Sequence, residues 1–110
     1  MNFASVLFLL AAVIIGLTLL LYILKNKNTP KALVFSHGFF ATLGLLALIV
    51  YALFHQIQLL MPAAIFVVAA MGGLILAWRD LIGLSLPKSL AIGHGLIALL
   101  GIIVLFCYML

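Results

Sequence analysis

The apolar residues of this chain fall into four long runs separated by short polar segments, near residues 3–24, 32–54, 59–78 and 89–110. Each run has roughly the 20 residues that a helix needs to cross about 30 Å of hydrocarbon. Backbone groups inside a bilayer have no water to bond with, so such runs must be helical. The pattern therefore predicts an all-α membrane protein, a four-transmembrane-helix bundle that forms a single domain over residues 1–110.

A segment in the first half of the chain occurs again in the second half. Residues 30–53 align without a gap with residues 87–110, at an offset of 57, and 11 of the 24 positions are identical. The same offset places Gly16 on Gly73 and Ala12 on Ala69. We interpret the chain as two tandem-duplicated helical hairpins, about 1–55 and 58–110. Because each hairpin has two spans, both copies insert with the same orientation, as a parallel repeat.

Several shared residues of this repeat lie three or four positions apart, which places them on one face of a helix. In the first copy this stripe holds His37, Ala41, Gly44, Leu48 and Tyr51. In the second copy it holds His94, Ala98, Gly101, Leu105 and Tyr108. One face of each helix thus combines a histidine with small residues. Any proposed function must account for this combination.

The net charge of +4 could suggest nucleic acid, but the basic residues are confined to two connections between apolar runs. They are Lys25, Lys27, Lys31, Arg79 and Lys88. Both connections fall on one side of a four-span bundle, which the positive-inside rule makes cytoplasmic. We therefore expect no nucleic-acid partner, a lipid bilayer around the chain, a bacterial inner-membrane location, and N- and C-termini outside. The first run lacks a basic region before it, so we expect a retained helix rather than a signal peptide.

Each stripe histidine follows the lysine at the cytoplasmic boundary by six residues, or roughly 9 Å along a helix axis. An ionisable residue at that depth is costly, and it usually faces the bundle interior and marks function. Two such residues related by a pseudo-twofold axis should converge. We therefore predict that His37 and His94 are the axial ligands of one haem b between the second and fourth helices.

The residues around the histidines suit this hypothesis. Small residues beside them would leave room for a flat macrocycle, namely Gly38, Ala41, Gly44, Gly95, Ala98 and Gly101. The propionates would point toward the cytoplasmic boundary and meet Lys31 and Lys88 in charge-assisted pairs. Bis-histidine haem of this kind supports electron transfer.

A minimal four-span bundle with two histidine-bearing helices resembles the small membrane b-type cytochromes, the cytochrome b561-like bundles. The resemblance covers the architecture together with His37 and His94, and it implies electron transfer to or from a quinone. Those families commonly carry two haems and four histidines. Here His55 returns to the same face as His37, but its counterpart at the 57-residue offset would be position 112, past Leu110. We therefore expect one haem in each chain.

Other functions remain open at this point. The histidines could be interhelical hydrogen-bond donors in a packing seam, in a non-catalytic subunit or scaffold of a larger membrane complex. A transition-metal or proton-handling site is a further alternative, and a homodimer sharing haem across its interface would give the same pattern. Zinc is disfavoured because two histidines leave its tetrahedral shell half empty.

Two enzyme or transporter classes are disfavoured by composition. Small multidrug transporters depend on a glutamate within the membrane, and this chain has none; its one acid, Asp80, follows the third apolar run. No nucleophile with an acid–base partner is present to suggest a hydrolase or transferase. We expect Arg79 and Asp80 to be solvated at the interface, and Gly72 and Gly73 to mark a helix contact.

Overall fold

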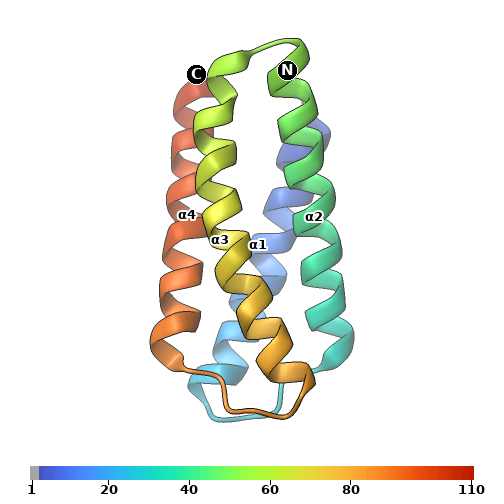
Figure 1. Ribbon diagram of the computed structural model, residues 1–110, viewed down its shortest axis with the longest axis vertical. Helices are drawn as coiled ribbons and strands as arrows, with labels where there is room; N and C mark the ends of the chain where they lie inside the picture. The colour runs from blue at the N-terminus through green and yellow to red at the C-terminus, as the bar shows by residue number, and fades with distance from the viewer. Residues whose placement is uncertain (1–2) are drawn as a thin grey trace.

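The computed structural model describes residues 3–110 as an elongated bundle of helices (Figure 1). The elements are α1 (Phe3–Leu24), α2 (Lys31–Phe54), the short 3₁₀ turn η1 (Ile57–Leu59), α3 (Leu60–Leu81) and α4 (Lys88–Met109). All four α-helices are long and apolar enough to cross a membrane. The predicted all-helical, four-span architecture is confirmed at this level, and it indicates a multi-pass membrane protein.

The third helix extends one turn beyond the predicted end at Trp78. Arg79 and Asp80 continue the helix, which ends at Leu81; Gly83 follows in the turn, with a φ of 82°. Charged residues can remain helical at a membrane boundary because their side chains reach water or a partner there. The apolar run therefore ends at Trp78, whereas the helix continues to Leu81.

Each hairpin is one pair of neighbouring helices, and the two pairs lie against each other. α1 packs along α2 and α3 packs along α4, while α1 also contacts α4 and α2 contacts α3. The helices α2 and α4 consequently lie on one diagonal of the bundle. The molecule measures 42 × 22 × 19 Å, and its length matches a bilayer of about 40–45 Å including headgroups.

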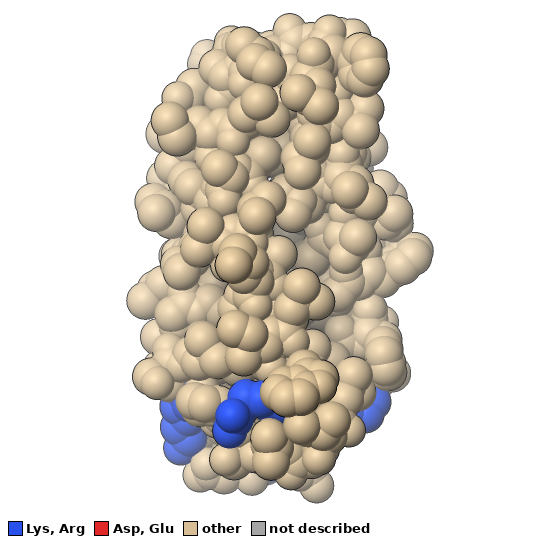
Figure 2. All heavy atoms as spheres, viewed as in Figure 1, with Lys and Arg blue, Asp and Glu red and all other residues tan. Residues whose placement is uncertain are grey.

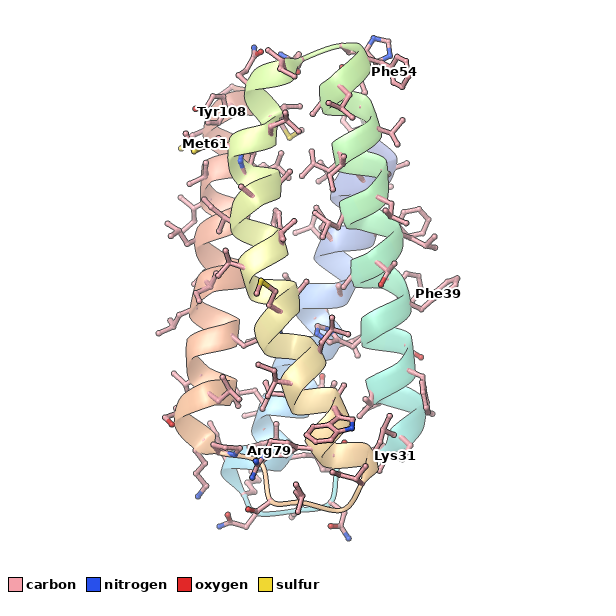
Figure 3. All side chains as sticks on the ribbon, viewed as in Figure 1. Lys31, Phe39, Phe54, Met61, Arg79 and Tyr108 are labelled. Atoms are coloured by element: carbon pink, nitrogen blue, oxygen red, sulfur yellow. The ribbon has the colours of Figure 1, made fainter. Side chains whose placement is uncertain are left out.

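Most large apolar side chains point outward from this bundle (Figure 3). Phe39, Leu46 and Leu74, for example, are 60%, 55% and 71% exposed. The buried apolar cluster is small by comparison, and it consists of Val6, Leu9, Leu48, Ala52, Leu59, Ala63, Phe66, Ile102 and Leu105. A surface of this kind is suited to lipid, since water would make its exposure strongly unfavourable.

The two connections that join α1 to α2 and α3 to α4 have the same backbone geometry. The first helix of each hairpin is followed by a residue with positive φ, Asn26 at 56° and Gly83 at 82°. Asparagine and glycine are the residues that best tolerate this left-handed conformation. The second helix of each hairpin is preceded by a proline, Pro30 or Pro87, with φ −63° and ψ 124° in both cases. Each matched pair is 57 residues apart.

We call the end of the bundle that carries these two connections the basic end, residues 25–31 and 79–88. On the face shown in Figure 2 the Lys and Arg atoms gather there. The expectation that Asp80 is solvated is wrong, because its side chain is only 12% exposed. Its carboxylate accepts hydrogen bonds from Lys31 Nζ at 2.8 Å and from Thr29 Oγ1 at 2.5 Å. A lone acid among five basic residues has an ion-pair partner available, and this pair links α3 to the start of α2.

We predict that Asp80→Asn lowers the free energy of unfolding by about 1–2 kcal/mol, because it removes the charged acceptor that both Lys31 and the buried Thr29 share. Unfolding of the detergent-solubilised protein by SDS, followed by circular dichroism, measures the change. Lys88→Gln is the matched control, since Lys88 is exposed and makes no ion pair within residues 3–110. Equal effects of the two substitutions would contradict the structural role of the pair.

Candidate functional site

The two stripe histidines meet in the interior of the bundle, nearer to its basic end. His37 lies in the second turn of α2 and His94 in the second turn of α4, so the rings come from the two diagonal helices. Their ring centroids are 6.0 Å apart and their planes are nearly perpendicular, at 89°. Both residues are half-buried. The structure thus brings together the two residues that the sequence placed at one depth.

Each ring is held by the other helix of its own hairpin. His37 Nδ1 lies 2.7 Å from the backbone oxygen of Ala12, and His94 Nδ1 lies 2.6 Å from that of Ala69. A carbonyl oxygen can only accept, so Nδ1 carries the proton and donates in both cases. In a neutral ring with this tautomer, Nε2 retains its lone pair, as a metal ligand requires.

Glycines in α1 and α3 make this contact possible. A Cβ atom added to Gly16 would lie 2.9 Å from Cε1 of His37, and one added to Gly73 would lie 2.9 Å from Cε1 of His94. Each glycine follows the accepting alanine by four residues. Without a side chain there, the alanine carbonyl stays open to a second donor besides its own helical N–H. The sequence contained this signal as matched Ala-x-x-x-Gly steps, but nothing in it showed that they receive the histidines.

Further along the stripe, the small residues accommodate side chains from within the same hairpin. A Cβ added to Gly44 would lie 2.8 Å from Cγ of Leu9, and one added to Gly101 would lie 2.9 Å from Cε1 of Phe66. Both glycines are buried, whereas Ala41 and Ala98 are partly buried. The stripe therefore faces the interior, and side chains of the neighbouring helices fill the space beside its two glycines.

The glycines next to the histidines, Gly38 and Gly95, lie away from the centre. Apart from the adjacent residues and the helix's own backbone, no described atom would come within 4 Å of an added Cβ at either position.

The two lysines predicted to meet the propionates, Lys31 and Lys88, differ in their partners. Lys31 is paired with Asp80 at 2.8 Å, and Lys88 is exposed without an ion-pair partner in residues 3–110. Of these two lysines, only Lys88 could pair with a new anion without losing the ion pair to Asp80.

The distance between the two rings can be compared with the spacing that a shared metal would impose. A metal held about 2 Å from a nitrogen of each ring would space the ring centroids by about 6 Å, and the observed spacing is 6.0 Å. Within residues 3–110 no group of three or more His, Cys, Asp or Glu side chains could hold a metal ion. Two imidazoles complete the axial positions of a haem iron but half of a zinc shell. The spacing of the two rings is therefore compatible with two imidazoles on one iron, while the glycines further along the stripe are filled by side chains.

Comparison of the chain with family models, with curated proteins and with solved structures gave no match. The class is therefore defined by the structure itself: a four-helix membrane bundle with a pair of imidazoles from diagonal helices in its interior. The function of this pair must be inferred from its geometry.

We predict that Gly16→Ala and Gly73→Ala each lower the free energy of unfolding by about 1–2 kcal/mol. The added methyl group would push the ring away and weaken its hydrogen bond to the carbonyl. Gly38→Ala and Gly95→Ala are matched controls in the same hairpins, because the new methyl group meets open space. SDS-induced unfolding in detergent compares the four variants. Equal decreases in the free energy of unfolding at all four positions would show that Gly16 and Gly73 are not needed for the packing of the rings.

Proposed function

We propose that the chain is a membrane b-type cytochrome that transfers electrons through one haem b, with His37 and His94 as its axial ligands between α2 and α4. The meeting of the two rings at 6.0 Å supports this most strongly. Packing within a hairpin requires each ring to contact only its own partner helix. It does not require rings from the two diagonal helices to approach each other on the bundle axis.

The hydrogen bonds at Nδ1 support the same proposal. Histidines that ligate metals usually donate their other N–H to a carbonyl or carboxylate, which fixes the tautomer and the ring orientation. Here the carbonyls of Ala12 and Ala69 accept that proton. With Nδ1 as the donor, Nε2 is the nitrogen of each ring that would bind the iron.

A bound haem would supply one-electron redox chemistry, and the protein would supply its ligands and surroundings. The apolar helices around the pair exclude water, which favours a low-dielectric site. Lys88 at the basic end is available for a propionate, whereas Lys31 would share its charge with Asp80. The resemblance to small four-span cytochromes suggests a quinone or a larger membrane complex as the redox partner.

The visible spectrum of the detergent-purified protein from haem-replete cells tests this proposal. We expect a Soret band that shifts on reduction, together with a resolved α band. His37→Ala or His94→Ala should abolish both bands, because each removes one axial ligand. His55→Ala is the matched control and should keep them, since His55 is exposed at the opposite end of the bundle and its ring contacts that of Tyr51.

A colourless wild-type protein would overturn the cytochrome proposal and favour a second candidate, a non-catalytic subunit or scaffold. A specific observation favours that candidate as well. Each histidine donates to a backbone carbonyl of the neighbouring helix and rests against a glycine, as a helix-packing seam requires. In that case His37→Ala or His94→Ala would lower the unfolding free energy by about 0.6–2 kcal/mol and change no spectrum.

We further propose a bacterial inner-membrane location, with the basic end in the cytoplasm and both chain ends outside. The one-sided charge supports this orientation through the positive-inside rule. Alkaline phosphatase fused after Leu110 should be active, because that enzyme folds only outside the cytoplasm. A green fluorescent protein fused at the same position should be dark. The reverse pair of results would contradict the proposed orientation.

We also infer that the two hairpins arose by tandem duplication. The contacts from His37 to Ala12 and Gly16 recur from His94 to Ala69 and Gly73 at the same 57-residue offset. The positive-φ residues and the prolines of the two connections repeat at that offset too. Shared ancestry accounts for this agreement more simply than independent origin.

A further inference from the structure

A cavity of about 230 Å³ lies among α1, α2, η1 and α4 at the end of the bundle opposite the basic end. Its lining includes Tyr51 and Tyr108, which occupy equivalent positions of the repeat. Figure 3 labels Tyr108 close to that end. Tyr51 follows His37 by 14 residues, or roughly 21 Å along α2. The cavity is therefore separate from the histidine site, and the proposed function does not use it.

The chemistry of the lining favours a neutral, amphipathic molecule. None of the described residues that form it carries a full charge. Val6 and Leu48 provide apolar wall, while Ser5, Tyr51 and Tyr108 provide three hydroxyl groups and Gln56 an amide. Binding sites for small molecules usually combine a mainly apolar wall with a few polar groups that fix orientation. Hydroxyls and an amide can each donate or accept, so they suit a ligand with one hydroxyl group.

The size of the cavity favours a single ring rather than a long chain. A cavity of about 150 Å³ is sufficient to hold benzene, so about 230 Å³ accommodates a ring with a substituent. Leu48 and Leu105, each 1% exposed, belong to the buried core that borders the cavity. An extended acyl chain would have to displace these side chains. Aromatic residues on the wall add favourable contacts for a flat ring.

From these observations we propose that this cavity binds a small neutral molecule built of one aromatic ring with a hydroxyl group, a phenol in chemical class. The ring occupies the apolar part, and its hydroxyl group exchanges hydrogen bonds with Tyr51, Tyr108 or Gln56. Binding here is independent of haem, so the failure of either proposal leaves the other standing.

The test uses 4-fluorophenol as the probe, titrated into the full chain in detergent and followed by fluorine NMR, with protein-free micelles as the blank. Wild-type protein should show saturable binding beyond partition into the micelle. Val6→Phe places a larger side chain in the cavity, and it should reduce the affinity at least tenfold. Leu7→Phe is the matched control at the next position, because Leu7 is 66% exposed on the lipid side; it should bind like the wild type.

A second variant keeps the test decisive if Val6→Phe fails to fold. Tyr108→Phe removes one hydroxyl group from a residue that is 40% exposed, and it should weaken binding about 3–10-fold. No saturable binding to the wild type would overturn the proposal and indicate a cavity filled by water. Binding that neither Val6→Phe nor Tyr108→Phe weakens would also overturn it, because the probe would then occupy another site.

Discussion

The bundle depends on the contact between each histidine ring and the neighbouring helix, where the ring donates a hydrogen bond to an alanine carbonyl and packs against a glycine. An imidazole N–H within a bilayer needs an acceptor, because no water is available to it. The acceptor here is a helical carbonyl that is already bonded within its own helix but has a second lone pair. A glycine four residues later leaves that carbonyl open and lets the ring approach. Alanine, glycine and histidine therefore act as one unit that fixes how the two helices of a hairpin pair.

The repetition of this unit produces the candidate site. Each hairpin positions its own ring on its own partner helix, and the two hairpins then pack through α1 with α4 and α2 with α3. Since α2 and α4 are diagonal, both rings point toward the bundle axis and meet at 6.0 Å. The same contacts that stabilise the hairpins thus create a pair of imidazoles with available Nε2 atoms. A packing seam and a ligand pair share the same atoms, which is why the visible spectrum separates them better than stability does.

The two ends of the bundle differ from the part that holds the two histidine contacts. At the basic end Asp80 binds Lys31 and Thr29, and this cluster has no counterpart in the first hairpin, where the position 57 residues before Asp80 is Ile23. The cluster links the second hairpin to the start of α2. At the other end the buried apolar cluster joins the helices and borders the cavity. The histidine pair therefore lies between a cluster of polar contacts around Asp80 and the buried apolar cluster.

The sequence by itself determined the features that depend on local composition and period. Four apolar runs predicted four helices, the lysines and arginine marked one end, and the 57-residue offset placed His37 and His94 at equal depth. Tertiary structure decided which groups those residues meet. It assigned Ala12 and Ala69 as acceptors, filled Gly44 and Gly101 with Leu9 and Phe66, and buried Asp80 against Lys31. The physical reason is that helices in lipid are apolar on nearly every face, so hydrophobicity does not specify which faces associate. Close packing and a few hydrogen bonds make that choice, and both depend on residues that are distant in the chain.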